Sequence, residues 1–329
     1  MDESAPPSPE TDEPPTLAQV AAYAGVSPIT VSRVVRLPAL VAVPTRQRVE
    51  AAMLALGYVP NLVAGSLASA RTRSVGVLVP TVANAIFADT IQGISDALEP
   101  LGYAVFLAQS RYDPDREDKM LAALLARRPE ALIMVGSPAT AAGARMLRRA
   151  RIPVVETWDL PDDPIDAVAG FDNTKAGAVV ARHFAASGRR LLGFLGGDDP
   201  RATRRWLGFQ RVALEAGLDA PLRVVHARNA GAGVAAADGM RGLDAVFVAN
   251  DALAIGLLSG LRHMGRRVPD DVAVIGLGDL ETGRLINPAL STVRIDGETI
   301  GRTAAGLTIS RDGPRRVDLG FELLTRETG

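Results

Sequence analysis

The sequence predicts an all-α helix-turn-helix unit at the N-terminus, followed by a much larger α/β region with parallel sheets. The first observation is helical periodicity over residues 16–56, interrupted by turn residues at 24–26 and around Pro38. The second is that short runs of Val, Ile and Leu alternate with amphipathic segments from residue 74 onward. Continuous apolar strands alternating with helices are typical of parallel sheets buried under helices on both faces. The length of this region predicts two such lobes.

Four segments are expected along the chain. Residues 1–15 hold five acidic residues, five prolines and no basic residue, which is typical of a disordered acidic tail. A helix-turn-helix domain is expected over 16–59, and a stretch of small residues over 60–73. An α/β core is expected over 74–329.

Composition narrows the class of protein. The net charge is −1, but residues 16–73 carry six arginines against the single acid Glu50, as a small nucleic-acid module would. The chain has no cysteine, so disulfides and thiol chemistry are excluded. An acidic N-terminus and the lack of any run of 18 apolar residues argue against a secretory signal and a membrane span. A cytoplasmic protein without membrane partners is expected.

The segment TLAQVAAYAGVSPITVSRVVR at residues 16–36 has the pattern of two short helices joined by a turn. Thr16 and Ser27 are placed to cap the two helices, because their hydroxyls accept hydrogen bonds from free N–H groups at a helix start. Gly25 suits the turn, and Pro28 suits the first helical position. The pattern indicates a helix-turn-helix whose second helix fits the major groove of DNA.

On the second helix the valines at 31, 34 and 35 are expected to face inward, which leaves the other side chains for DNA. Arg33 is able to contact guanine, and Ile29 a thymine methyl group. The candidate DNA-contacting residues of the headpiece are Thr16, Ser27, Pro28, Ile29, Thr30, Ser32 and Arg33. Two short helices around a glycine turn without a DNA role remain the alternative at this level.

The sequence resembles the lactose/galactose repressor family. The resemblance rests on TL..VA..AGVS..TVSRV followed by P..V...TR.RVEAAM..LGY.PN..A..L, and it continues through the α/β region. It implies a three-helix headpiece, with Pro28, Ile29 and Arg33 at the base-reading positions. It also implies that 16–59 form a DNA-binding domain, that 60–73 form a hinge helix and linker, and that 74–329 form a two-lobed periplasmic-binding-protein-like core for effector binding and dimerisation. A homodimer on a pseudo-palindromic double-stranded operator follows from the same resemblance. The resemblance favours a dimer over a tetramer, because no extra C-terminal helix is expected after FELLTRETG.

The stretch GYVPNLVAGSLASA at residues 57–70 matches the hinge of that family. A helix this short is marginal in water. By resemblance it becomes helical when two copies meet over the minor groove. Asn61 would then contact the backbone, Ala64 would allow close approach of the partner, and Leu67 would wedge between base steps. An ordinary linker is the alternative.

Polar residues that follow predicted strands are the candidates for a ligand cleft between the lobes, because the C-terminal ends of parallel strands converge there. Arg205, Asn250 and Asp251 coincide with effector contacts of the family. Gly278 stands where the family often has an aspartate, and Asp279, one position later, is the candidate for the acidic contact. The candidate effector-binding residues are Asn84, Phe87, Gln109, Arg111, Trp158, Asp159, Arg201, Arg205, Asn250, Asp251 and Asp279, with Asp172 and Asn173 beside them.

Several stretches look most like the gluconate-operon repressor branch of the family. They are VANAIFADTIQGI (82–94), VVETWD (154–159), GFDN (170–173) and the paired arginines 201 and 205. Arginines near one predicted cleft suit a carboxylate, so a sugar acid is the hypothesis for the effector, with neutral sugars left open. Whether the effector releases or promotes DNA binding stays open too.

Two other classes of protein compete with this interpretation. GFLGGDDPR at 193–201 follows a strand, but it lacks the G-x-G-x-x-G spacing of a dinucleotide loop. The three histidines stand alone, without metal spacing or a nucleophile–base pair, so neither an enzyme nor a cofactor is expected. A sugar-specific solute-binding protein without a DNA-binding role is the stronger rival, and the helix-turn-helix argues against it.

Overall fold

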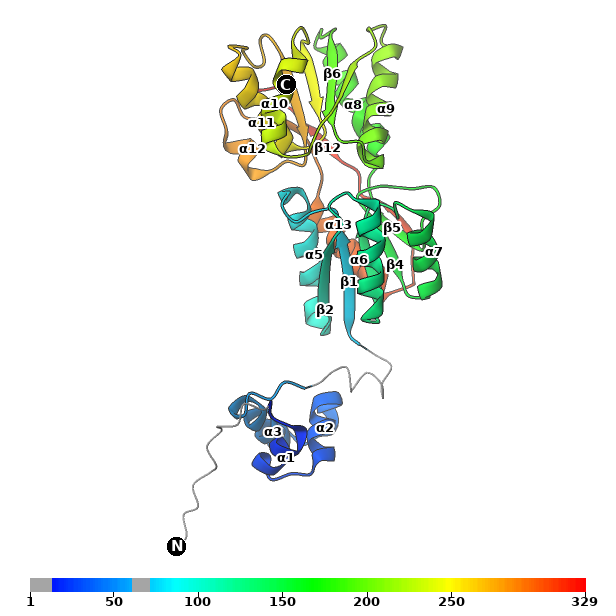
Figure 1. Ribbon diagram of the computed structural model, residues 1–329, viewed down its shortest axis with the longest axis vertical. Helices are drawn as coiled ribbons and strands as arrows, with labels where there is room; N and C mark the ends of the chain where they lie inside the picture. Colours follow the sequence, from blue (N-terminus) through cyan, green and yellow to red (C-terminus); the bar gives the residue numbers. More distant parts are fainter. Residues whose placement is uncertain (1–13, 61–71) are drawn as a thin grey trace. The chain divides into compact units, whose positions relative to one another are not determined.

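The computed structural model describes residues 14–60 and 72–329 (Figure 1). The chain divides into two compact units, Met1–Thr72 and Arg73–Gly329. The hinge residues Asn61, Ala64 and Leu67 lie outside the described residues. The predicted tail and hinge boundaries therefore stay predictions.

The headpiece consists of three α-helices and one short 3₁₀ helix. Thr16 and Gln19 form a capping box, with Thr16 N donating to Gln19 Oε1 at 2.7 Å. Gly25 ends the first helix at φ 64°, a left-handed conformation that glycine adopts without steric cost. The side chains of Val20, Val31 and the rest of a small apolar cluster are buried between the helices. The elements are α1 (Leu17–Ala24), α2 (Pro28–Arg36), η1 (Pro38–Leu40) and α3 (Val43–Ala55).

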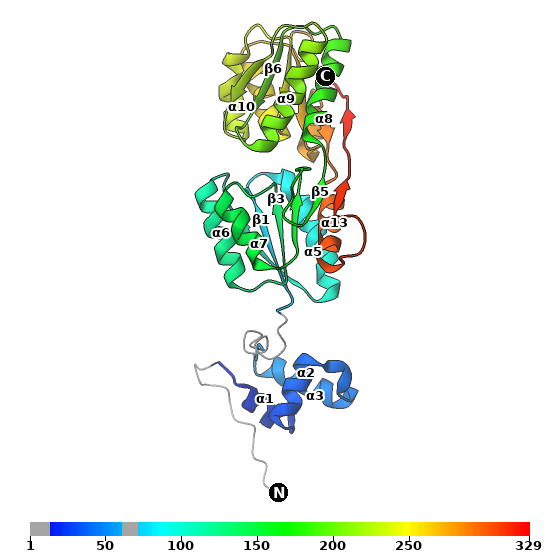
Figure 2. The ribbon, with the colours of Figure 1, turned by 90° about the vertical axis from the view of Figure 1, so that its right-hand side faces the viewer.

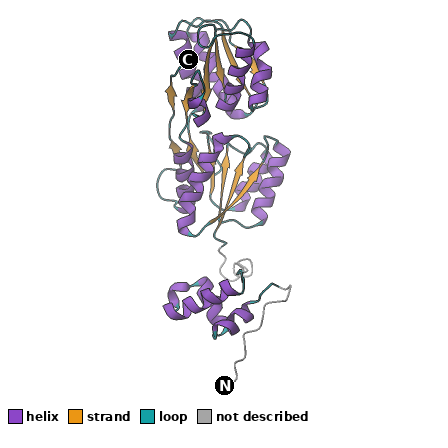
Figure 3. Ribbon diagram, turned by 90° about the vertical axis from the view of Figure 1, so that its left-hand side faces the viewer, coloured by secondary structure: helices purple, strands orange, loops and turns teal. Residues whose placement is uncertain are grey.

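The first lobe of the large unit is a six-stranded parallel sheet covered on both faces by helices (Figure 3). Its order is β11-β5-β4-β3-β1-β2. Alternate side chains of each central strand enter different apolar clusters, one with α5 and α13 and the other with α6 and α7. The strands are β1 (Ser74–Val79), β2 (Ala104–Gln109), β3 (Ala131–Val135), β4 (Val154–Thr157), β5 (Ala167–Gly170) and β11 (Arg316–Asp318). The helices are η2 (Ala85–Phe87), α5 (Ala88–Leu98), η3 (Glu99–Leu101), α6 (Pro114–Ala126), α7 (Ala141–Ala150) and α13 (Gly297–Ile309).

The second lobe repeats this architecture in the order β12-β10-β9-β8-β6-β7. The edge strand β12 pairs antiparallel with β10, and the other pairs are parallel. The strands are β6 (Leu192–Gly196), β7 (Leu222–Val225), β8 (Ala245–Val248), β9 (Ala273–Leu277), β10 (Ser291–Arg294) and β12 (Glu322–Leu324). The helices are α8 (Asn173–Ala186), α9 (Pro200–Glu215), α10 (Ala230–Ala236), η4 (Ala237–Met240), α11 (Asp251–His263) and α12 (Glu281–Leu285).

The chain crosses between the two lobes three times, from β5 to α8, from β10 to α13 and from β11 to β12. Figure 2 shows β11 and β12 along one side of the unit. All three crossings leave or enter at the sheet edge formed by β5 and β11 in one lobe and by β10 and β12 in the other. The strands β2 and β7 form the opposite edges. The large unit is therefore hinged along one side.

Helices α8 and α9 pack unusually closely, and this packing places the arginines of α9. A Cβ atom on Gly177 would lie 1.9 Å from the carbonyl oxygen of Arg205, and one on Gly208 would lie 1.9 Å from that of Thr174. Only glycine allows backbones to approach this closely. The start of α9 is thus held against the start of α8, beside the connection between the lobes.

Among the described helices, none is long and apolar enough to cross a membrane.

Candidate functional site

The second helix of the headpiece exposes the residues predicted to read DNA. Its first turn is fixed by Ser27, whose Oγ accepts a hydrogen bond from Thr30 N at 3.2 Å. Val31 and Val34 are buried, whereas Ile29 is 71% exposed and Arg33 is exposed. Because Ile29 and Arg33 are four residues apart, they lie on the same face of α2. That face combines an apolar contact with a cation, which suits a thymine methyl and a guanine edge.

The other candidates on the headpiece flank that face. Thr16, Ser27 and Pro28 are exposed, while Thr30 and Ser32 are partly buried. The hydroxyls of Thr16 and Ser27 serve as helix caps. A phosphate at either helix start would therefore be bound mainly by backbone N–H groups. Val35, expected to face inward, is only half-buried.

A pocket lies between the two lobes of the large unit, where about 410 Å³ of space, open solvent included, is free of protein atoms. Six of the predicted effector residues belong to its wall: Asn84, Phe87, Trp158, Arg201, Arg205 and Asn250. The wall also contains seven residues that the sequence interpretation did not single out: Ile86, Tyr112, Gly197, Asp199, Arg228, Ala249 and Leu277.

One side of the pocket is aromatic. The rings of Phe87 and Trp158 meet edge to face with centroids 5.2 Å apart. The indole N–H of Trp158 donates to Thr90 Oγ1 at 2.9 Å, so its hydrogen bond is already made inside the protein. Trp158 therefore offers the pocket an apolar surface rather than a donor.

Another part of the wall is formed by the start of α9. Its cap is Asp199, whose Oδ1 accepts from Ala202 N at 3.2 Å. Arg201 and Arg205 follow one turn apart and are 8% and 7% exposed. Nη1 of Arg205 donates to Asn173 Oδ1, while its Nε is buried without a hydrogen-bond partner among the described residues.

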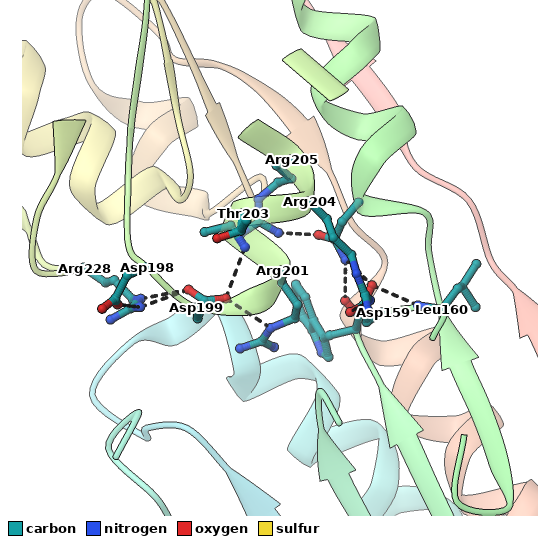
Figure 4. Close-up of polar contacts among 12 residues, drawn as sticks. Asp159, Leu160, Asp198, Asp199, Arg201, Thr203, Arg204, Arg205 and Arg228 are labelled. Atoms are coloured by element: carbon teal, nitrogen blue, oxygen red, sulfur yellow. Dashed lines mark hydrogen bonds and ion pairs between the residues drawn. The ribbon is translucent and has the colours of Figure 1, made fainter. Parts of the chain in front are cut away.

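A third arginine enters from the loop after β7. Arg228 Nε and Nη2 donate to Asp199 Oδ2 at 3.1 and 3.0 Å, and Nη2 also donates to Asp198 Oδ1 at 3.1 Å (Figure 4). Arg201 Nε lies 3.7 Å from Asp199 Oδ1. Burial by itself raises the pKa of the Asp199 carboxyl, but the guanidinium groups of Arg201, Arg205 and Arg228 outweigh it and lower that pKa to about 2. Asp199 is thus a carboxylate at neutral pH.

Two domain families match the chain at separate places. The bacterial regulatory proteins of the lacI family match residues 16–61, and the periplasmic binding protein-like domain matches residues 181–327. HTH-type transcriptional regulator GntR of Pseudomonas aeruginosa is 37% identical, over 95% of this chain and 95% of that protein. The chain belongs to the lacI family of bacterial transcriptional regulators.

Two solved structures resemble this regulator over nearly the whole chain. A LacI-family transcriptional regulator from Silicibacter pomeroyi is 32% identical, with a TM-score of 0.88 over 96% of this chain and 99% of that one. The lac repressor dimer bound to operator and the anti-inducer ONPF is 27% identical, with a TM-score of 0.82 over 96% and 99%. Relatives with matching length are named as transcriptional regulators, which argues against a solute-binding protein without a DNA-binding role.

Five predicted effector residues of the regulator are not among those that line the pocket: Gln109, Arg111, Asp159, Asp251 and Asp279. Asp159 is buried and is engaged by Arg204 and by Asn173 Nδ2, the latter at 3.0 Å. Arg111 is exposed, with its N–H bonded to Pro80 O at 2.7 Å. Gln109 is the last residue of β2, and its carbonyl accepts from Arg116 Nε at 3.1 Å. Asp172 caps α8 by accepting from Lys175 N at 3.0 Å.

The two aspartates of the second lobe have structural partners. Asp251 accepts from Thr292 Oγ1 at 2.7 Å and from Leu280 N at 2.8 Å, and burial raises its pKa to about 6. Asp279 is paired with Arg284 at 2.7 Å and Arg326 at 2.6 Å. Both carboxylates are therefore bound by hydrogen bonds or ion pairs to other residues of the second lobe.

The backbone at Gly278 explains why no acidic side chain stands at that point of the wall. Its φ is 131°, and a Cβ atom there would lie 3.2 Å from Ile86 Cδ1. Leu277 forms the wall instead, and Asp279 is turned away at φ 57°. The wall thereby has one negative residue fewer than the family pattern implies.

Three of the pocket residues that the sequence did not predict lie in loops after strands, like most of those that it did predict. Asp199 comes shortly after β6, Arg228 after β7, and Tyr112 after β2. Attention to strand ends could have named Asp199 and Tyr112, because their neighbours were considered, but not Arg228, because the sequence did not predict β7. It could not say which residue of each loop turns inward, since consecutive loop residues point in different directions.

Proposed function

We propose that this regulator is a repressor whose effector is a small polyhydroxylated carboxylic acid, a sugar acid of the gluconate type, bound in the pocket between the lobes. The observation that carries the proposal is the excess of positive charge in the wall. Three guanidinium groups face one ionised carboxylate, that of Asp199. The second carboxylate on Arg228, that of Asp198, has a side chain 83% exposed.

A buried cation without a full set of partners is costly, because it has lost water and gained nothing in return. The Arg201 side chain makes no hydrogen bond within the described residues; its Nε lies 3.7 Å from Asp199 Oδ1, and its guanidinium lies over the Phe87 ring, 5.6 Å from the centroid. The Nε of Arg205 has no partner either. Two adjacent guanidinium groups with free N–H donors fit a ligand carboxylate, for which arginine has the matching planar geometry.

The remaining walls fit the rest of a sugar acid. Asn84 Oδ1 accepts from Ile86 N at 3.3 Å, and Asn250 Oδ1 accepts from Leu253 N at 2.9 Å. Each asparagine uses its oxygen as a helix cap, which leaves its NH₂ group free to donate to a ligand hydroxyl. The edge-to-face pair of Phe87 and Trp158 suits the C–H side of a carbon chain.

We also propose that this regulator acts in the cytoplasm of the bacterium as a homodimer that binds a pseudo-palindromic operator. The lac repressor, solved as a dimer on its operator, supports both points by its similarity in fold. The free sheet edges offer apolar surface for a second copy: Phe106 and Leu107 of β2 are 42% and 44% exposed, and Val225 of β7 is 52% exposed. Base reading is assigned to the α2 face of Ile29 and Arg33, and the predicted hinge residues keep their proposed minor-groove role.

The effector is tested by calorimetric titration of the full chain with D-gluconate and with D-glucose. The expected result is saturable binding of gluconate and no binding of glucose, because only the acid supplies a counter-charge to the arginines. A gel shift with DNA from upstream of the gene, with and without gluconate, then shows whether the ligand releases or promotes DNA binding. Binding of the neutral sugar alone would end the sugar-acid proposal.

A further inference from the structure

Two side chains meet across the pocket from different lobes. Tyr112 belongs to the loop between β2 and α6 in the first lobe, and Arg228 to the loop between β7 and α10 in the second. The guanidinium carbon of Arg228 lies over the Tyr112 ring, 3.9 Å from its centroid. A cation at this distance over an aromatic face is attracted by the ring's quadrupole.

We propose that Tyr112 and Arg228 form a latch that holds the two lobes closed whether or not a ligand is bound. The topology supports this role. The loops that carry the pair follow β2 and β7, the edge strands that lie opposite the three crossings of the chain. A contact on the side away from a hinge resists opening of the lobes with the greatest leverage.

The second lobe holds Arg228 ready for this contact. Asp198 and Asp199 bind its guanidinium from one side, and the side chain remains only 18% exposed. Gly197 provides the space, because a Cβ atom there would lie 2.2 Å from Arg228 Nη2. The guanidinium is therefore held in place by the second lobe before it meets the ring.

The first lobe presents Tyr112 at some cost to its own backbone. Arg111 and Tyr112 have φ values of 58° and 61°, so two consecutive residues other than glycine are left-handed. This conformation is unfavourable for side chains with a Cβ, and it persists only where surrounding interactions hold it. Here Arg111 N donates to Pro80 O at 2.7 Å and Asp113 N to Ser110 O at 3.2 Å, and the turn directs the Tyr112 ring into the pocket wall.

The latch is tested without any ligand by measuring the distance between the lobes in the full chain. The chain has no cysteine, so spin labels attach only at introduced ones. Suitable exposed positions are Lys119 on α6 and Ala235 on α10, each replaced by Cys. Mixing labelled protein with an excess of unlabelled protein suppresses distances between subunits. Distances measured by pulsed electron–electron double resonance then report the separation of the lobes.

In this labelled background, Tyr112→Leu removes the ring face and Arg228→Gln removes the charge. We expect both to add a population with longer distances, raising the open fraction about threefold to thirtyfold. Tyr112→Phe keeps the ring, so it should match the wild type, and circular dichroism checks that each variant is folded. Unchanged distances in a folded Tyr112→Leu or Arg228→Gln variant would overturn the latch. Because no ligand is added, this outcome is independent of whether the effector is a sugar acid.

Discussion

Arg201 Nε lies 3.7 Å from Asp199 Oδ1, beyond hydrogen-bond distance, although both side chains are largely buried. Asp199 instead accepts hydrogen bonds from Arg228 Nε and Nη2, at 3.1 and 3.0 Å. An anion that enters the pocket therefore finds Arg201 without a strong competing partner. The free N–H groups of this arginine are the feature on which effector recognition is proposed to depend.

We expect Arg201→Gln to weaken gluconate binding by about tenfold to a hundredfold, because a hydrogen bond to a charged group contributes roughly 1.5–3 kcal/mol. Ligand-free thermal stability should be equal or higher, since an under-paired buried cation is removed. Calorimetric titration and thermal unfolding measure the two effects. Arg211→Gln on the same helix, where the arginine is 59% exposed and paired with Glu215, is the matched control. Equal affinity for the two variants would remove Arg201 from the effector site.

Arg33→Ala should weaken operator binding by about 1–3 kcal/mol and relax the preference at one base position. The physical reason is that the exposed Arg33 shares the α2 face with Ile29, where a guanidinium can meet a guanine edge. Quantitative gel shifts on an operator library measure the change, with Arg36→Ala in the last turn of α2 for comparison. A uniform loss over all sequences would show that Arg33 contacts phosphate instead.

Glu156 makes folding stability depend on pH. This β4 side chain is 1% exposed, its Oε2 has no hydrogen-bond partner among the described residues, and burial raises its pKa to about 7. An acid with a raised folded-state pKa is most favourable below its unfolded pKa of about 4.5, and stability is lost as the pH rises towards 7. Glu156→Gln should therefore stabilise the protein at pH 8 by on the order of 3 kcal/mol and have far less effect near pH 4. Urea unfolding at the two pH values, with the exposed Glu215→Gln as control, measures this.

Gly208→Ala should destabilise the large unit by about 1–3 kcal/mol, because the added methyl would meet the Thr174 carbonyl and force α8 and α9 apart. The shift would also displace Arg205, so weaker gluconate binding should accompany it. Gly306→Ala in α13 is the matched control, since nothing lies within 4 Å of its Cβ position. That variant should gain about 0.5–1 kcal/mol from helix propensity. Thermal unfolding distinguishes them; equal effects of the two substitutions would contradict the close-packing argument.

Much of this protein is encoded locally. Thr16, Gly25, Ser27 and Pro28 specify the headpiece helices through caps and turn conformations that involve residues at most four positions away. The alternation of apolar strands with amphipathic helices predicted the two α/β lobes, because burial on both faces requires continuous apolar strands. The family resemblance placed Arg205 and Asn250 in the cleft, and both line the pocket.

The identity of the remaining wall residues was decided only by tertiary structure. Asp279 stands next to the expected position, but Arg326, 47 residues away, engages its carboxylate and Gly278 turns the backbone. Tyr112 enters the pocket rather than Arg111 because two left-handed residues set the direction of that loop. Sequence by itself indicated that loops following the predicted strands meet at the cleft, because the carboxyl ends of parallel strands lie at one edge of a sheet, but it did not predict β7 or the loop that carries Arg228. Which side chain of each loop faces the ligand depends on backbone angles and on partners distant in the chain, and these exist only in the folded protein.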